Sequence, residues 1–96
     1  MLFLVEITLN VPADHDPAAF EALRAAEKRH LHELQAAGSW RHIWRVVGQS
    51  ANVSIFDVGS NAELHDILTS LPLYPFMDLR VTALCRHPAS MHPDDR

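Results

Sequence analysis

The stretch WRHIWRVVGQSANVSIFDV, residues 40–58, decides how this chain folds. Its two arms, residues 40–47 and 52–58, are runs rich in β-branched, aromatic and other strand-forming side chains. The four residues between them, GQSA at 48–51, contain the small and polar side chains that turns favour. Two such runs joined by a short loop predict an antiparallel hairpin in the middle of the chain.

One amphipathic helix is predicted on each side of this hairpin. Residues 17–37 carry apolar side chains at helical spacing, with Asp16 as the N-cap, Pro17 in the first turn and Gly38 as the stop. On the other side, SNAE at residues 60–63 has the spacing of a capping box, and apolar residues follow at helical intervals. Each helix therefore has an apolar face that can cover a sheet.

Two more strands lie outside the helices. Residues 2–9 form an apolar run that stops at Asn10 and Pro12, and residues 78–86 form the last strand. The segment PLYPF at 72–76 is predicted to be an extended connection, since its prolines end the second helix. The order β-α-β-β-α-β is that of the α+β ferredoxin-like fold, in which two helices cover one face of a four-stranded antiparallel sheet.

The predicted sheet also has an open face that neither helix covers. Alternation along the hairpin places five apolar side chains there: Trp40, Trp44, Val46, Val53 and Ile55. Such a face predicts contact with another subunit, so we expect a homo-oligomer. Residues 2–87 form one domain, and the polar tail, residues 88–96, is expected to pack at a subunit interface because it cannot fold alone.

Composition excludes several classes of function. The net charge of −4 and the lack of a basic block predict no nucleic-acid or membrane partner. The opening residues, MLFLVEITLN, lack the pattern of a signal peptide, and no apolar run is long enough to span a membrane. Cys85 is the single cysteine and is predicted to lie in the core of the last strand. We expect a cytoplasmic protein.

Glu27 lies on the apolar stripe of the first predicted helix, four residues after Leu23 and four before Leu31. A carboxylate held against a core loses hydration, which raises its pKa from about 4.3 toward the range that suits a general base. In the alternative, the stem packs inward while the head group reaches water or pairs with Lys28 or His30. The helix alone leaves both interpretations open.

Polar side chains also gather on one face of the predicted hairpin. With the loop described above, Arg45 lies opposite Ser54 and shares a face with Asn52, among apolar neighbours. A few polar groups on an apolar face are typical of a small-molecule site. Alternatively, Arg45 reaches the sheet edge and Ser54 is a satisfied strand hydroxyl. The other face would place His42 opposite Asp57, more as a cross-strand polar pair than as a catalytic dyad.

The seven histidines do not have metal-binding spacing. His30 and His32 are two residues apart on a helix and point about 200° from each other. The chain has no HExxH motif, no cysteine pair and no glycine-rich phosphate loop. The sequence therefore predicts no metal and no cofactor, and a metal site built from distant histidines is the alternative.

The chain resembles the muconolactone Δ-isomerase family over nearly its whole length. The resemblance is carried by the opening MLFLV, the pair Glu27-Lys28, WRHIWRVVG at 40–48, ANVSIFDV at 51–58, ELHDILTSLPLYPFMD at 63–78 and LCRHPAS at 84–90. Ser50 and Val53 stand where aromatic residues are usual in the family, and Tyr74 and Phe76 are exchanged. The resemblance implies a ferredoxin-like subunit, a homodecamer, no cofactor and a place in catechol breakdown through the β-ketoadipate pathway.

The resemblance also implies a reaction, the 1,3-proton shift that converts muconolactone to 3-oxoadipate enol-lactone. Glu27 would remove the acidic ring proton, and the same acid would return a proton to the carbon beside the lactone carbonyl. The expected substrate contacts are Asn52 and Ser54 at the lactone oxygen, Arg45 at the side-chain carboxylate, and Lys28 and His42 as further candidates. If Glu27 were only a surface residue, His42 would be the next candidate for the base.

Two other functions fit the same residues. A dehalogenase of chlorinated muconolactones would use the same base and expel chloride. A non-catalytic ferredoxin-like module would bind a small ligand, but it has no need for a buried carboxylate on the helix stripe.

Overall fold

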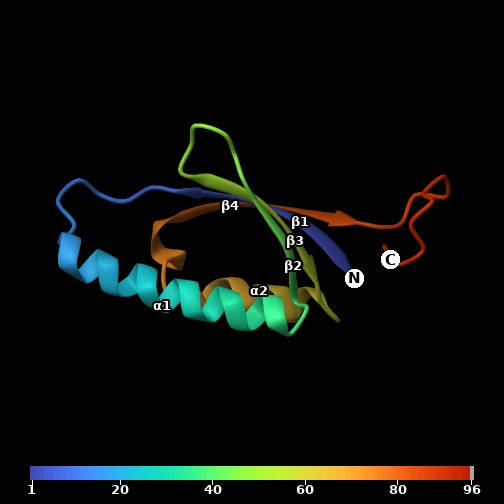
Figure 1. Cartoon of the computed structure of the whole chain (residues 1–96), viewed down its shortest axis with the longest axis horizontal. Coiled ribbons are helices and arrows are strands. Elements are labelled where there is room, and N and C mark those ends of the chain that lie inside the picture. The colour runs from blue at the N-terminus through green and yellow to red at the C-terminus, as the bar shows by residue number, and fades with distance from the viewer. Residues whose placement is uncertain (96) are drawn as a thin grey trace.

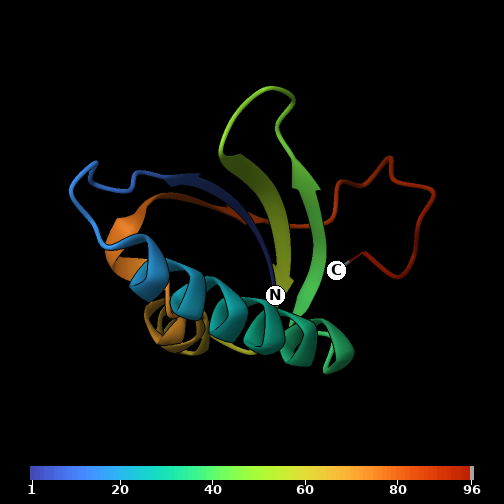
Figure 2. The ribbon, with the colours of Figure 1, turned by 60° about the vertical axis from the view of Figure 1, so that its left-hand side comes forward.

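The computed structural model describes residues 1–95 and confirms the predicted order of elements (Figure 1). The strands are β1 (Leu2–Leu9), β2 (Trp40–Arg45), β3 (Ala51–Asp57) and β4 (Met77–Leu84), and the helices are α1 (Pro17–Ala36) and α2 (Asn61–Ser70). All neighbouring strands are antiparallel, in the order β2-β3-β1-β4. Both helices lie on one face of this sheet (Figure 2), so the predicted ferredoxin-like architecture is confirmed.

The predicted helix ends are confirmed by their capping contacts. The Asp16 carboxylate accepts a hydrogen bond from the backbone N–H of Ala18, and Gly38 follows α1 with a φ of 84°, a conformation that glycine adopts without strain. At α2, Ser60 Oγ accepts from the backbone N–H of Glu63 at 3.1 Å. Within residues 1–95, no helix is long and apolar enough to cross a membrane.

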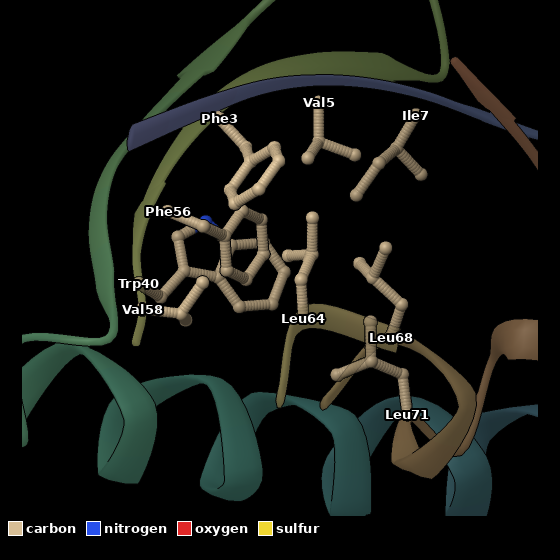
Figure 3. Packing of buried hydrophobic residues seen from close by; sticks show 9 residues of the cluster. All are labelled: Phe3, Val5, Ile7, Trp40, Phe56, Val58, Leu64, Leu68 and Leu71. Atoms are coloured by element: carbon tan, nitrogen blue, oxygen red, sulfur yellow. The ribbon is translucent and has the colours of Figure 1, made fainter. Parts of the chain in front are cut away.

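The main core lies between β1, the start of β2, the end of β3 and helix α2 (Figure 3). Its buried apolar residues are Phe3, Val5, Ile7, Trp40, Phe56, Val58, Leu64, Leu68 and Leu71. Leu31 and Leu34 of α1 are partly buried and pack against this cluster. Burying a large apolar side chain stabilises a fold by roughly 1.5–3 kcal/mol, so this cluster anchors α2 and the C-terminal half of α1 to the sheet.

The hairpin register differs from the predicted one by two residues. Arg45 lies opposite Asn52, not opposite Ser54. The loop begins and ends one residue earlier than predicted, because the backbone N–H of Val46 already donates to the carbonyl of Ala51 at 3.0 Å. Since strand side chains alternate with a period of two, a shift of two residues keeps Arg45, Asn52 and Ser54 on one face.

A β-bulge at Arg41 overturns one prediction for the open face. Trp40 pairs with Phe56 while His42 pairs with Ile55, so Arg41 is an extra residue in β2. The extra residue turns Trp40 to the helix side, where it is only 1% exposed and packs on Phe56 with ring centroids 4.6 Å apart. The prediction that Trp40 lies on the open face is therefore wrong.

Trp44, Val53 and Ile55 keep their place on the predicted open face, whereas Val46 lies beyond the end of β2. Trp44 is 57% exposed, and Val53 and Ile55 beside it are half-buried. The His42 ring stacks on Trp44 with centroids 5.1 Å apart. His42 lies opposite Ile55 rather than opposite Asp57, which corrects the predicted polar pair.

The connection into β4 also differs from the expected extended segment. Tyr74–Phe76 form a short 3₁₀ helix, η1, and the turn before it is closed by a hydrogen bond from the Tyr74 N–H to the Leu71 carbonyl at 2.9 Å. The φ that proline imposes suits such turns as well as extended chain. β4 then ends at Leu84, so Cys85 is exposed and the prediction of a core cysteine is wrong.

The tail returns toward the start of β2. Arg41 forms an ion pair with Asp95 at 3.1 Å, and the Arg86 guanidinium donates to the Ser90 carbonyl at 2.9 Å. A hollow of about 430 Å³ lies between the open face and the tail, and Trp44 is among the residues that line it.

Candidate active site

Glu27 occupies the third turn of α1 and points toward the sheet side of the helix. It is 8% exposed, and within residues 1–95 it is the one buried side chain that carries a charge when ionised. Its position follows from helical spacing, because Leu23 and Leu31 lie one turn to either side and are themselves partly buried. The expectation that this carboxyl is held inside rather than at the surface is met.

A main-chain group holds the Glu27 head group. The backbone N–H of Leu73, just before η1, donates to Glu27 Oε1 at 3.0 Å. The alternative pairing with Lys28 or His30 is not what the described residues show, since His30 instead contacts Ser70 Oγ at 3.0 Å. This hydrogen bond lowers the free-energy cost of burying the carboxyl, because one of its two oxygens keeps a polar partner.

Burial raises the pKa of Glu27 above the usual value of a glutamate. The hydrogen bond from Leu73 and the nearby His30 act in the opposite direction and limit this rise. Such a balance suits a group that must accept a proton in one step and give one back in the next.

A cavity of about 1030 Å³ opens between α1 and the sheet, and Glu27 forms part of its wall. Apolar side chains from β1, α1 and β2 line most of it, among them Ile7, Leu9, Phe20, Leu31, Trp40 and Ile43. Arg24 and Lys28 on α1 and Arg45 on β2 bring positive charge to the same wall. The cavity thus combines an apolar lining with the buried carboxyl of Glu27, the exposed carboxyl of Glu21 and three cations, which suits a small organic anion.

The structure brings three of the five predicted substrate contacts to this cavity. Lys28, Arg45 and Asn52 all line it, and Arg45 and Asn52 face each other across the β2–β3 ladder. Arg45 is also tied to its own loop, because its guanidinium donates to the carbonyl of Gln49 at 3.2 Å. A cation and an amide therefore meet opposite the helix that carries Glu27.

Ser54 and His42 are placed differently. Ser54 is fully buried, and its Oγ donates to Asn52 Oδ1 at 2.8 Å. This contact occupies the acceptor of the Asn52 amide and leaves its N–H groups to point elsewhere, so Ser54 acts by orienting Asn52. His42 lies on the open face and lines the hollow under the tail, so the structure does not bring it to Glu27.

Two residues of the cavity region were not found from the sequence. Arg24 lines the cavity and pairs with Glu21 at 3.4 Å. Its position three residues before Glu27 places it on the same helix face, a signal that helical spacing contains. The Leu73 amide has no such signal, because any residue except proline carries a backbone N–H.

The described residues offer no cluster for a metal ion. Within residues 1–95, no group of three or more histidine, cysteine, aspartate or glutamate side chains is close enough to hold one.

The fold and the cavity define a ferredoxin-like α+β protein with one buried carboxyl set for acid–base chemistry. Comparison with known proteins then gives the family: residues 1–90 match the profile of muconolactone delta-isomerase, and the chain belongs to this family. The resemblance seen in the sequence is thereby confirmed.

Similar proteins agree over the full length. The chain is 53% identical to a Muconolactone Delta-isomerase of Pseudomonas aeruginosa over 96 residues, which is 100% of both chains. It is also 53% identical to Muconolactone Delta-isomerase 2 of Acinetobacter lwoffii, again over 100% of both. A crystal structure of muconolactone isomerase at 3.3 Å resolution superposes with a TM-score of 0.94 at 53% identity and covers both chains completely.

Proposed function

We propose that this protein is a muconolactone Δ-isomerase that converts muconolactone to 3-oxoadipate enol-lactone without a cofactor. The observation that carries the proposal is the buried Glu27 carboxyl in the wall of a cavity that also presents cations. Membership of the family and the full-length identity to named isomerases support the choice of substrate.

The reaction begins with Glu27 as a carboxylate. The Glu27 oxygen that is not bound to Leu73 removes the ring proton at the carbon that bears the substrate's side chain. The electron pair then moves through the ring double bond onto the carbonyl oxygen of the lactone. This gives a dienolate and a protonated Glu27. The dienolate then collapses, the lactone carbonyl re-forms, and the carbon next to it takes the proton back from Glu27. One carboxyl serves both steps, and positioned acid–base catalysis of this kind contributes roughly 10²–10⁴-fold.

The cations that line the cavity can balance the negative charges of the substrate carboxylate and of the dienolate. The substrate brings a carboxylate into a cavity that already holds the charge of Glu27, so a counter-charge is needed. Arg45 is suited to the substrate carboxylate because a guanidinium can bind it with two parallel hydrogen bonds. Asn52, held by Ser54, and Lys28 on α1 are suited to the lactone oxygen, where negative charge develops.

An assay with purified protein tests the proposal. We expect muconolactone to be consumed, as measured by ultraviolet absorbance, with no change when a chelator is present. Chloride release from a chlorinated muconolactone is measured in parallel and distinguishes the dehalogenase. A protein that binds the lactone without turning it over would contradict the isomerase and favour a binding module.

We also propose that the subunits assemble into a homo-oligomer, a decamer as the family resemblance implies, and that the enzyme works in the cytoplasm. The exposed Trp44 and the half-buried Val53 and Ile55 on the open face support an interface there. The tail, which reaches the same face through Arg41, is a second candidate for the contact. Light scattering at micromolar concentration should report a mass many times the 10.8 kDa subunit. A 10.8 kDa species would contradict assembly.

A further inference from the structure

We propose that the backbone amide of Leu73 is a positioning group for catalysis: it fixes one oxygen of Glu27 and leaves the other as the proton carrier. This inference rests on the proposed function and adds a second residue to its machinery. The contact joins α1 to the turn before η1, two segments that are 46 residues apart in the sequence.

The turn is built so that this amide is available. Tyr74 donates its N–H to the carbonyl of Leu71 at 2.9 Å, and Phe76 donates to the carbonyl of Leu73, also at 2.9 Å. Both of these bonds are internal to the segment 71–76, whereas the N–H of Leu73 is directed to Glu27 Oε1. Leu73 is itself buried, so the turn is packed into the protein at this point.

A second link holds the same segment against α1. His30, one turn after Glu27, contacts Ser70 Oγ through Nε2 at 3.0 Å. Ser70 Oγ donates its single hydrogen to the carbonyl of Ile67 at 2.6 Å, so it must accept a hydrogen from His30 Nε2. The end of α2 and the turn that follows it are thus fastened to α1 at two points, and the Leu73 amide has little freedom to leave Glu27.

The contact has a chemical consequence for Glu27. A backbone N–H binds a carboxylate more strongly than a neutral carboxylic acid, so it favours the ionised form. Burial favours the neutral form. Without the amide, more of the enzyme would hold Glu27 already protonated when substrate arrives, and that fraction could not remove the ring proton.

Other charged groups lie near Glu27, and they must stay constant in any test. The charged or titratable groups that share its cavity or its helix face are Glu21, Arg24, Lys28 and His30 on α1 and Arg45 on β2. The turn contributes only Tyr74, which is exposed. A test that alters the backbone at Leu73 leaves all of these side chains in place.

The experiment replaces the Leu73 amide by an ester, with leucic acid (the hydroxy-acid analogue of leucine) at position 73. This exchange removes the N–H and keeps the side chain. We expect the acid limb of the pH profile of kcat/KM for muconolactone to move upward by about 1–2 pH units, since a hydrogen bond to a charged group is lost. At a pH below the limb, the rate should fall about tenfold for each unit of the shift.

Two controls separate this effect from a weakened turn. An ester at Tyr74 removes the turn's own hydrogen bond to Leu71 but keeps the Leu73 amide. Leu73→Ala removes the buried side chain and also keeps the amide. Both should lower the melting temperature and leave the acid limb in place. The proposal is overturned if the Leu73 ester has the parent's limb, or if the Tyr74 ester shifts it equally.

A direct titration keeps the inference separate from the identity of the substrate. The ¹³C shift of the Glu27 carboxyl, observed in protein labelled at glutamate and assigned with Glu27→Gln, reports its pKa without turnover. The Leu73 ester should raise that pKa and the Tyr74 ester should not. If the parent fails to isomerise muconolactone while this pattern holds, the substrate assignment is wrong and the positioning role survives. An unchanged pKa overturns the role itself.

Discussion

The two faces of the sheet differ in how deeply their polar and aromatic residues are buried. On the helix side, Trp40 is buried against Phe56, and Glu27 faces a cavity from beneath the sheet. On the open side, Trp44 is more than half exposed, and His42 stacks on it without cover from a helix.

On the proposed function, this difference assigns the acid–base chemistry to the helix-covered face. Burial raises the pKa of a carboxyl, and Glu27 on the helix side of the sheet is buried in this way. The open face offers apolar area and, among residues 1–95, no buried charge, which suits contact with another surface. Matched substitutions on the two faces therefore test this difference.

The largest effect is expected for Glu27→Gln. Glutamine keeps the size and can still accept from the Leu73 N–H, but it cannot take up the ring proton. Turnover of muconolactone should fall about 10²–10⁴-fold while the melting temperature stays close to that of the parent. The matched control is Glu6→Gln, because Glu6 is an exposed carboxylate on the open face of β1. Near-parent turnover in Glu27→Gln would show that proton transfer lies elsewhere.

The next effect compares the two tryptophans of β2. Trp40→Ala should lower the free energy of unfolding by about 3–5 kcal/mol, because it leaves a cavity against Phe56 in the core. Trp44→Ala should cost less than about 1 kcal/mol within the subunit and should instead lower the mass seen by light scattering. Denaturant unfolding measured on both variants checks this. Equal losses would mean that the open face is part of the same folding core.

The smallest effect is expected for Arg45→Lys. Lysine keeps the charge but loses the two-pronged contact with a carboxylate, so KM should rise about tenfold, with a smaller change in kcat. Arg80→Lys is the control, since Arg80 is exposed on β4 away from the cavity. Steady-state kinetics on both variants gives the answer. A drop in kcat alone would place Arg45 at the reacting atoms instead of at the substrate carboxylate.

Much of the fold could be predicted from local signals. Asp16, Ser60 and Gly38 mark helix ends by their own chemistry, and the structure places the ends where these residues predict them. Glu27 could be singled out because a charge on an apolar stripe conflicts with its surroundings. These features depend on neighbours within one turn of helix, which the sequence contains in full.

The features that were missed depend on distant partners. The local sequence WRHIW does not predict an extra residue at Arg41. Trp40 and Ile43 are three residues apart, so both can lie on the helix side only if the alternation of side chains is interrupted between them. The register of the hairpin was missed for a related reason, since a loop of the same length can close one residue earlier. The Leu73 contact joins a backbone N–H to the Glu27 side chain across 46 residues, and the identity of the donor's side chain does not encode it.

The hydrogen bond from Leu73 to Glu27, a tether between the turn and α1, has a consequence for which substitutions this sequence can accept. Its donor is a main-chain atom, so every amino acid except proline supplies it at position 73. Side chains through the turn, Tyr74 and Phe76 among them, can therefore be replaced while the contact to the Glu27 carboxyl is kept. What must be kept for this contact is the path of the backbone, so replacing Leu73 by any residue except proline should cost packing without removing the tether.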